Sequence, residues 1–423
     1  MTLTASEQYL LELMNRARLD PGAEALRMGI DLNQGLGAGT LTYTARQVVA
    51  PNAMLEAAAT KHSVWQLATD TLSQTGQGGS QPFGRMLAEG YRATTYAENL
   101  GIVGLGVGQS LQTGLEDLHR TLFLSADNRI GLLTGGLREV GIGAETGIYT
   151  QNGQNYNAVA LTLNLATTGT AHFLTGVAYR DTDKNAFYSI GEGTGNVVFK
   201  AAGQTTATAA AGGYSLGLGS SVSTAVSGHV GALNFALTVD MSAGNVKLDV
   251  VDGATFATSG NVTLGTGINN VVMLGAGFLA ATGNAAGNSL TGNNAANALT
   301  GLGGNDKLSG FGGNDKIDGG FGRDVLTGGK GIDMMTGGAG ADVFVFTALE
   351  GLDKIVDFTL AAGDRLRIDD ALWGGADLKA SEIISRFVTK GDGEVVFDFG
   401  PGEQIRLLGL TGMGGLAAAI DIF

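Results

Sequence analysis

Residues 301–345 read GLGGNDKLSGFGGNDKIDGGFGRDVLTGGKGIDMMTGGAGADVFV and repeat with a period of nine residues. Aspartate recurs at every ninth position from Asp306 to Asp342, and an apolar residue follows two positions after each aspartate. A flexible glycine linker would not keep a carboxylate and an apolar side chain in fixed phase. The period instead predicts a β-roll, in which six residues turn, three form a short strand and two nonapeptides complete one coil.

Three positions of the repeat carry the pattern. Position 4 is glycine, at Gly304, Gly313, Gly322, Gly331 and Gly340. Position 6 is aspartate, at Asp306, Asp315, Asp324, Asp333 and Asp342. Position 8 is apolar, at Leu308, Ile317, Leu326, Met335 and Phe344. Because the position 8 side chains recur once per half-coil, we expect them to stack into a thin apolar core.

The aspartates are expected to form two columns, one on each edge of the roll. Asp306, Asp324 and Asp342 line one edge, and Asp315 and Asp333 line the other, since stacked strands lie roughly 4.7–4.9 Å apart. Stacked carboxylates repel one another, whereas Ca²⁺ prefers several oxygen ligands. The pairs 306–324, 315–333 and 324–342 therefore predict three calcium sites. Their ligands are the aspartates and loop carbonyl oxygens of Gly304, Gly313, Gly322 and Gly331.

Two earlier repeats keep the phase but change the ligand. Residues 283–291 and 292–300 place Asn288 and Asn297 at position 6. A neutral amide is a weaker ligand than a carboxylate and repels its neighbours less. We interpret these coils as an N-terminal cap with partial sites.

This arrangement resembles the RTX (repeats-in-toxin) β-roll over about 283–423. The segment GGAGADVFVF…DKIVDFTLAAGDRLRID is similar to the region after the roll in secreted bacterial proteases and lipases. The final residues AAAIDIF are similar to the C-terminus that type I exporters recognise. The resemblance implies Ca²⁺ as cofactor, a type I exporter as partner, and a secreted, extracellular or cell-surface location in bacteria.

A second candidate calcium loop lies at residues 181–192. Its ligand spacing is that of an EF-hand, with Asp181, Asp183, Asn185, Phe187 (through its carbonyl oxygen), Ser189 and Glu192 at positions 1, 3, 5, 7, 9 and 12. Ala186 stands where an EF-hand has glycine, and the flanks favour strands. The loop and the later GGYSL resemble the calcium-binding β-sandwiches of the B-repeat type in bacterial surface adhesins. An acidic, solvated turn is the alternative interpretation.

The first 168 residues resemble the bacterial branch of the CAP superfamily, which includes the cysteine-rich secretory and pathogenesis-related proteins. The matching stretches include LLELMNRARLDPG, AENLG, LFLSADNRIGLL and REVGIGAE. The resemblance implies an α-β-α sandwich with a central cleft. The two family histidines map to Gln74 and Asn128, and the family glutamate maps to Glu98. Amides do not act as general bases at neutral pH, so we expect a degenerate cleft with no catalytic residue.

Composition excludes several classes of protein. There is no cysteine, so disulfides and thiolate metal sites are impossible, and the formal net charge of −14 argues against nucleic acid and anionic membrane surfaces. No apolar run reaches membrane-spanning length, and we see no N-terminal secretion signal. At the N-terminus, Ser6 is a candidate cap for a helix with Leu10 and Met14 on one face.

The sequence therefore predicts a multidomain chain. We expect an α+β domain over 1–168, an antiparallel β-sandwich over 169–258, a parallel β-roll with lead-in coils over 259–345, and a β cap with an export signal over 346–423. The leading hypothesis is a secreted calcium-binding protein whose CAP-like domain is a non-catalytic binding or adhesion module for a cell-envelope, matrix or other extracellular ligand. The alternatives are a CAP-type secreted hydrolase or protease that uses Glu98, and a calcium-dependent matrix or surface-layer component.

Overall fold

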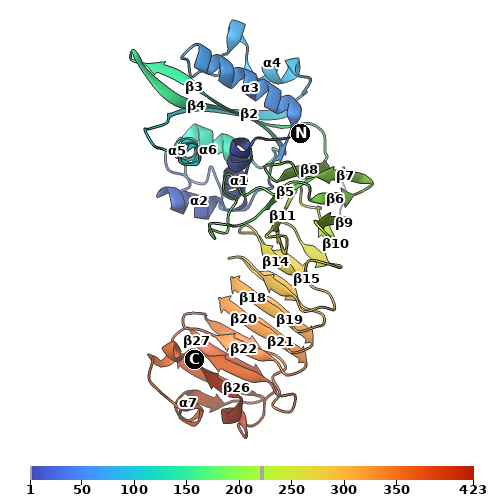
Figure 1. The fold of residues 1–423 in the computed structure, drawn as a ribbon. Helices are drawn as coiled ribbons and strands as arrows, with labels where there is room; N and C mark the ends of the chain where they lie inside the picture. Colours follow the sequence, from blue (N-terminus) through green and yellow to red (C-terminus); the bar gives the residue numbers. More distant parts are fainter. Residues whose placement is uncertain (1, 220–222) are drawn as a thin grey trace. The chain divides into compact units, whose positions relative to one another are not determined.

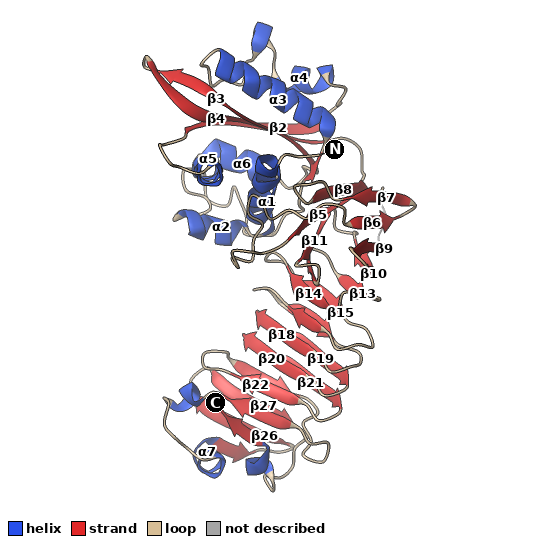
Figure 2. Cartoon of the chain, in the orientation of Figure 1, coloured by secondary structure: helices blue, strands red, loops and turns tan. Residues whose placement is uncertain are grey.

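The computed structural model describes residues 2–219 and 223–423. The chain divides into two compact units, Met1–Leu233 with Asp240–Gly253 and Asn234–Val239 with Ala254–Phe423. Most helices belong to the first unit, and strands dominate the second (Figures 1 and 2). No helix within the described ranges is long and apolar enough to cross a membrane. The prediction of a multidomain chain is confirmed.

The N-terminal part of the first unit contains a four-stranded sheet in the order β1-β3-β4-β2. Its strands are β1 (Ala50–Pro51), β3 (Glu139–Gln151), β4 (Gln154–Thr167) and β2 (Thr95–Gly104). β4 pairs antiparallel with both β2 and β3, and β1 pairs parallel with β3. The helices are α1 (Ala5–Leu19), α2 (Pro21–Met28), α3 (Ala53–Ala68), α4 (Pro82–Ala88), α5 (Leu111–Leu124) and α6 (Ala126–Leu133).

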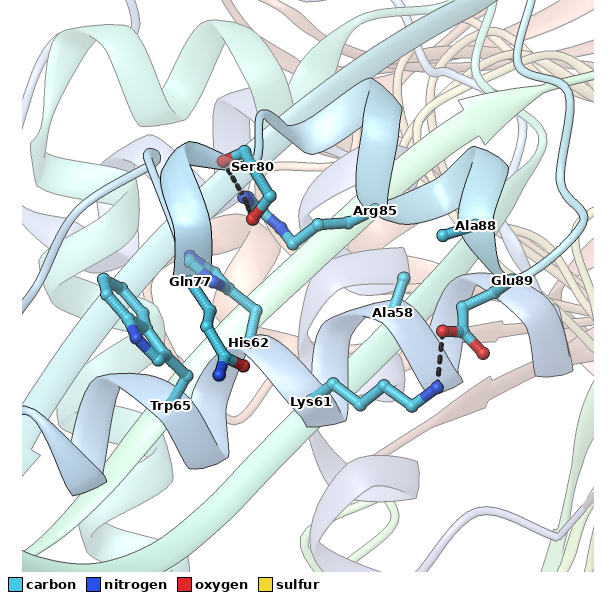
Figure 3. A pocket seen from close by; sticks show the side chains of 9 residues that line it. All are labelled: Ala58, Lys61, His62, Trp65, Gln77, Ser80, Arg85, Ala88 and Glu89. Carbon is cyan, nitrogen blue, oxygen red and sulfur yellow. Dashed lines mark hydrogen bonds and ion pairs between the residues drawn. The ribbon is translucent and has the colours of Figure 1, made fainter.

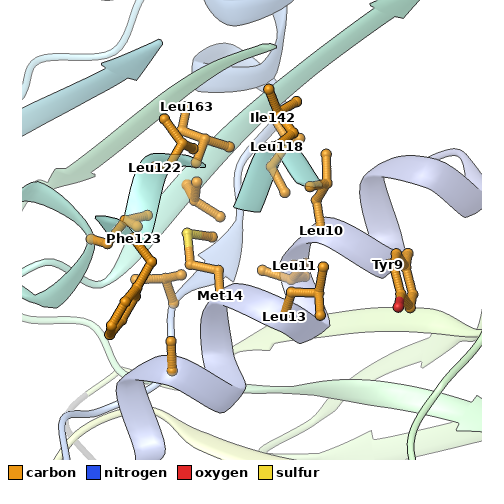
Figure 4. Packing of buried hydrophobic residues seen from close by; sticks show 14 of the residues in the cluster. Tyr9, Leu10, Leu11, Leu13, Met14, Leu118, Leu122, Phe123, Ile142 and Leu163 are labelled. Atoms are coloured by element: carbon orange, nitrogen blue, oxygen red, sulfur yellow. The ribbon is translucent and has the colours of Figure 1, made fainter. Parts of the chain in front are cut away.

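Helices pack on both faces of this sheet because glycines let them approach. A Cβ atom on Gly141 of β3 would lie 1.9 Å from the backbone of Leu55 in α3, so only glycine fits there. On the other face, a Cβ atom on Gly101 of β2 would lie 2.8 Å from Leu118 in α5. Figure 4 shows the core on that second face, where α1 and α5 side chains meet Ile142 and Leu163 of the sheet.

The cap predicted for the first helix is wrong. The helix begins at Ala5, and Thr4 is its N-cap: the Thr4 side chain accepts a hydrogen bond from the Glu7 amide, while the Glu7 carboxylate accepts from the Thr4 amide. This reciprocal capping box satisfies two amide groups that have no partner within the helix. Ser6 lies inside the first turn.

The middle part of the first unit contains two groups of paired strands. In one, β5 (Phe173–Tyr179) pairs antiparallel with β8 (Gly213–Gly217) but parallel with β11 (Val246–Val251). In the other, β6 (Val198–Ala201) pairs antiparallel with β7 (Gln204–Ala207) and β9 (Ser223–Val230). The rings of Phe199 and Tyr214 stack between them, with centroids 3.9 Å apart. The prediction of a purely antiparallel sandwich is therefore wrong at β5–β11.

The second unit is a β-solenoid made of two parallel sheets with alternating strands. One sheet contains β12 (Thr255–Thr258), β14 (Asn270–Met273), β16 (Ser289–Thr291), β18 (Lys307–Gly312), β20 (Val325–Lys330), β22 (Val343–Phe346), β24 (Arg365–Ile368) and β28 (Ile420–Ile422). The other contains β13 (Val262–Leu264), β15 (Leu279–Thr282), β17 (Asn297–Thr300), β19 (Lys316–Phe321), β21 (Met334–Ala339), β23 (Leu352–Ile355) and β27 (Glu403–Leu408). At its ends, β10 (Leu233–Asp240) pairs antiparallel with β13, and β26 (Glu394–Gly400) and β25 (Val388–Lys390) extend the sheet antiparallel from β27. One further helix, α7 (Ala380–Phe387), lies near the C-terminus.

The register of the roll confirms that two nonapeptides make one coil. Leu308 lies opposite Leu326, which in turn lies opposite Phe344, and Ile317 lies opposite Met335. All five of these position 8 side chains have 0 % exposure. They form the thin apolar core that the period predicted.

Candidate metal centre

The five repeat aspartates stand immediately before the strands of the roll. Asp306, Asp324 and Asp342 precede β18, β20 and β22 of one sheet, and Asp315 and Asp333 precede β19 and β21 of the other. Each is buried, with at most 3 % of the residue exposed. The structure thus places them in the two columns that their spacing predicted.

One oxygen of each carboxylate accepts a hydrogen bond from a backbone amide of the preceding coil. Oδ1 of Asp324 accepts the backbone amide of Asp306 at 2.8 Å, and Oδ1 of Asp342 accepts the amide of Asp324 at 2.9 Å. In the other column, Oδ1 of Asp333 accepts the amide of Asp315 at 2.7 Å. A hydrogen bond from an amide to an ionised carboxylate is among the stronger ones in proteins. The carboxylates therefore hold successive coils together directly.

The other oxygen of every repeat aspartate has no hydrogen-bond partner in the described part of the chain. This holds for Oδ2 of Asp306, Asp315, Asp324, Asp333 and Asp342, all of them buried. A buried polar atom without a partner costs about 1–3 kcal/mol, and more when it is charged. The pattern therefore leaves a row of desolvated, anionic oxygens, which is the donor set that a hard divalent cation would satisfy.

Carbonyl oxygens of the neighbouring coil share the space with these free carboxylate oxygens. A Cβ atom on Gly301 would lie 2.2 Å from Oδ2 of Asp306 and 2.4 Å from the carbonyl oxygen of Gly319. Gly310 faces Oδ2 of Asp315 and the carbonyl of Gly328 in the same way. These position 1 carbonyls are candidate ligands that sequence reasoning did not name.

The position 4 glycines, whose carbonyls the sequence put forward as ligands, bring the coils into contact. Gly322 has φ +144°, and a Cβ atom there would lie 1.6 Å from the carbonyl oxygen of Gly304. Gly331 is stacked on Gly313 in the same manner, with 1.9 Å between such a Cβ and the Gly313 carbonyl oxygen. Any side chain at these positions would push adjacent coils apart.

Burial shapes the electrostatics of the columns. It raises the pKa of Asp315 to about 7 and the pKa values of Asp333 and Asp342 to about 6, against the lowering effect of the amide hydrogen bonds. Burial also raises the pKa of Asp306 and Asp324. Neighbouring carboxylates such as Asp333 beside Asp315 add to the rise. Burial thus makes the ionised form of these aspartates unfavourable when no cation is bound. A bound cation would neutralise that charge.

The asparagine coils satisfy their own polar groups. Oδ1 of Asn288 accepts the backbone amide of Asn284 at 2.8 Å, and its side-chain nitrogen donates to Oδ1 of Asn284 and to the carbonyl of Asn269. Asn297 makes the equivalent bond with the Asn293 amide at 2.7 Å. These coils need no cation to complete their hydrogen bonding.

The loop at 181–192 brings three of its predicted ligands together. Carboxylate oxygens of Asp181, Asp183 and Glu192 lie within 4.8 Å of one another. Asn185 donates its side-chain amide to Asp183 and to Ser189. Ala186 adopts φ +58°, the left-handed conformation for which an EF-hand uses glycine at this position. Glu192 accepts the amides of Thr182 and Ser189, so it also shapes the loop.

The structure does not assemble the cleft predicted from Gln74, Glu98 and Asn128. Both oxygens of Glu98 accept hydrogen bonds from Arg85 of α4, at 2.9 and 2.7 Å. Asn128 of α6 accepts from the side chain of Asn99, the next residue along β2. Because successive strand residues point to opposite faces, Glu98 and Asn128 lie on opposite sides of the sheet. Gln74 is exposed, in the loop before the short 3-10 helix Gln77–Gly79.

A pocket of about 250 Å³ lies between α3, the 3-10 helix and α4 (Figure 3). His62 and Trp65 stack on one side of it, with ring centroids 5.4 Å apart. His62 bonds to the carbonyl of Ser73 through Nε2, and burial, with Arg85 nearby, lowers its pKa to about 4. The histidine is therefore neutral at physiological pH. Sequence reasoning missed this pocket because its residues form no recognisable motif.

Comparison with known proteins bears on the roll. A family model described as the RTX calcium-binding nonapeptide repeat (4 copies) matches residues 291–326 and 318–347. Among solved structures, the extracellular lipase LipA from Serratia marcescens aligns at 14% identity over 35% of this chain and 40% of the lipase, with a TM-score of 0.19. The chain thus spans less than half of that lipase. The comparison with curated proteins gave no match. Residues 291–347 of this protein therefore carry RTX calcium-binding nonapeptide repeats, which fold as a β-roll and bind Ca²⁺.

Proposed function

We propose that this is a secreted protein whose β-roll folds outside the cell when Ca²⁺ binds between its coils. The observation that carries the proposal is the row of buried, unpartnered Oδ2 atoms on Asp306, Asp315, Asp324, Asp333 and Asp342. In the proposed sites these oxygens, with backbone carbonyls of the adjacent coil, hold the cation. The bound ion supplies the positive charge that the two aspartate columns lack.

The free energy that bound calcium adds is large enough to switch the roll between unfolded and folded states. Extracellular calcium modules bind with a Kd of about 10⁻⁴–10⁻³ M, so at roughly millimolar calcium each site adds ~0.4–1.4 kcal/mol. Three sites then contribute ~1–4 kcal/mol, a large share of a typical domain stability of ~5–15 kcal/mol. At submicromolar calcium the contribution vanishes. A roll that is unfolded inside the cell and folded outside it is compatible with export by a type I exporter.

We further propose that the CAP-like part of the first unit is a binding module and not a catalyst. The carboxylate of Glu98 is engaged by Arg85 through both oxygens, and only 1% of its side chain is exposed. Amides occupy the positions of the family histidines. This geometry weighs against the alternative of a hydrolase that uses Glu98. The pocket beside His62 and Trp65 is the candidate ligand site of such a module.

A calcium titration of the full chain, followed by circular dichroism, tests the folding proposal. Strand signal is expected to grow as calcium rises from about 10⁻⁴ to 10⁻² M and to disappear when a chelator is added. Magnesium at the same concentrations serves as the control, since it demands a tighter octahedral site. A spectrum that is unchanged between chelator and calcium would refute the proposal.

The loop at 181–192 is proposed as a separate, structural calcium site. Asp183→Asn is expected to lower the calcium stoichiometry of the full chain by one ion and the Tm of the first unit by roughly 1–5 °C in millimolar calcium. In chelator the same substitution should lower the Tm by less, because only the hydrogen bonds that Asp183 accepts from Asn185 and Ser189 are then weakened. Asp127→Asn, an equal charge change at the exposed start of α6, is the control. Equal destabilisation with and without calcium would mean that the loop is an ordinary acidic turn.

A further inference from the structure

The aspartate columns continue beyond the last nonapeptide. The backbone amide of Asp333 donates to Oδ1 of Asp353 at 2.9 Å, and the amide of Asp342 donates to Oδ1 of Asp364 at 3.1 Å. These bonds repeat the amide-to-carboxylate hydrogen bonds that link the nonapeptide coils. Their sequence separations are 20 and 22 residues, where the nonapeptide aspartates are 18 apart. Short insertions therefore shift both aspartates out of the nine-residue spacing.

The coil that carries Asp353 repeats positions 4, 6 and 8 of the nonapeptide. Gly351 has φ +132°, and a Cβ atom there would lie 1.8 Å from the carbonyl oxygen of Gly331, so it occupies the position 4 stack. Two residues after Asp353, Ile355 is 0 % exposed in the apolar core. β23 pairs parallel with β21, with Ile355 opposite Met335. Geometrically, residues 351–355 are positions 4–8 of a further coil.

Asp333 and Asp353 each place a carboxyl group between their two coils. Oδ2 of Asp333 is buried and has no partner within the described residues. Asp353 is 2 % exposed, its Oδ1 is bound to the Asp333 amide, and its side chain lines a small pocket together with Glu350 and Glu403. These two glutamates add negative charge next to the pair. Four carboxyl groups therefore lie close together, with Asp333 and Asp353 buried and the two glutamates half-buried, and no ion pair to any of them is seen within the described residues.

The other column ends differently. Oδ1 of Asp364 accepts the Asp342 amide, and its Oδ2 accepts the Thr359 amide at 2.8 Å. Both oxygens are therefore committed to backbone amides of the protein. Asp364 ends its column with both carboxylate oxygens bonded to backbone amides. Asp353 ends the other column with a hydrogen bond seen at Oδ1 alone.

We infer that Asp333 and Asp353 form a fourth calcium site of the roll, beyond the three that the nonapeptide spacing defines, and that Asp364 contributes to none. The inference rests on the proposed calcium-dependent folding and extends it to the region after the repeats. In that site, calcium joins the last regular coil to the C-terminal cap strands β23, β27 and β26. Occupancy of this one site therefore couples the cap to the roll.

Equilibrium dialysis of the full chain against calcium chloride counts the ions. Asp353→Asn is expected to bind one ion fewer than the unmodified chain, and Asp364→Asn is expected to bind the same number as the unmodified chain. Circular dichroism at saturating calcium confirms that each variant retains the strand content of the roll. A loss in both variants, or in neither, would overturn the inference. A chain that binds no calcium at all would instead refute the proposed function.

A second measurement does not depend on any variant folding. In crystals of the calcium-loaded full chain, anomalous scattering should show a peak between Asp333 and Asp353 as well as peaks beside Asp306, Asp315 and Asp324. Peaks at the nonapeptide positions without one at Asp353 would overturn the inference and leave the proposed function standing.

Discussion

Asp324→Ala is expected to raise the calcium concentration for half-maximal folding of the roll by about tenfold or more. Asp324 is the middle member of its column, so the change removes a carboxylate from two calcium sites, worth ~1–3 kcal/mol at millimolar calcium. It also removes the acceptor of the Asp306 amide at 2.8 Å, which leaves a buried donor unpaired at a cost of about 1–3 kcal/mol. Since 1.4 kcal/mol is about a factor of ten, folding monitored by circular dichroism should shift well beyond measurement error.

Two variants serve as controls for Asp324→Ala. Asp306→Ala affects the end of the same column and a single complete site, so its shift is expected to be smaller. Asp318→Ala removes an equal charge from β19, outside the columns; because the Asp318 charge contributes to the raised pKa of Asp324, a small shift is expected, much smaller than that of Asp324→Ala. Equal midpoints for the Asp324 and Asp318 variants would contradict the assignment of the columns as the calcium ligands.

Lys247→Met is expected to destabilise the first unit by about 3–5 kcal/mol. Lys247 of β11 lies 2.8 Å from Oε2 of Glu12 in α1 and also forms an ion pair with Asp249. All three residues are at most 5 % exposed. Burial raises the pKa of both Glu12 and Asp249, and Lys247 opposes that rise. Without the lysine, two buried carboxylates would face each other with no compensating charge.

Urea denaturation in saturating calcium measures the effect, because the roll is then held constant. Lys200→Met, at an exposed position of β6, removes the same charge and is expected to change the free energy of unfolding by less than about 0.5 kcal/mol. Replacing Glu12 and Asp249 by leucine together with Lys247→Met is expected to recover only part of the loss. Apolar substitutions for buried ion groups are often neutral or stabilising, but the buried Val177 amide loses its acceptor Asp249, at a cost of about 1–3 kcal/mol. If Lys247→Met lowers the free energy of unfolding no more than Lys200→Met does, the charge of Lys247 does not stabilise the first unit.

The roll was predictable because one short period sets both its core and its charged edges. Position 8 residues such as Leu308 and Met335 are fully buried as the nine-residue spacing requires. The prediction failed only where the period changes length, as at Asp353 and Asp364. A signal for both does exist, because each aspartate follows a glycine closely and precedes a buried residue by two positions, Ile355 and Leu366.

Two residues of the roll occupy a conformation that their type disfavours. Leu302 has φ +74° and Phe311 has φ +79°, both at position 2, where later repeats have glycine. Both side chains are exposed, at 47% and 56%. The coil imposes a positive φ at position 2 whichever residue stands there. The sequence does not show that leucine and phenylalanine would tolerate the resulting backbone strain.

The first unit was less predictable because its decisive contacts join distant segments. Glu12 and Lys247 are unremarkable in sequence, and only the packing of α1 against β11 brings them together. The parallel pairing of β5 with β11 likewise depends on a long connection and leaves no local pattern. The prediction of the cleft failed for a similar reason. The order of the motifs identifies Glu98 and Asn128, but it does not show that they lie on opposite faces of the sheet.

Hydrogen–deuterium exchange of the full chain, with and without chelator, tests the central claim most directly. The backbone amides of Asp306, Asp315 and Asp324 are bonded to buried carboxylates of the next coil. If calcium is required to keep those carboxylates together, these amides will exchange rapidly in chelator and become protected when millimolar calcium is restored. Protection that is equally strong in chelator would show that the columns are stable without a cation, and it would contradict the account.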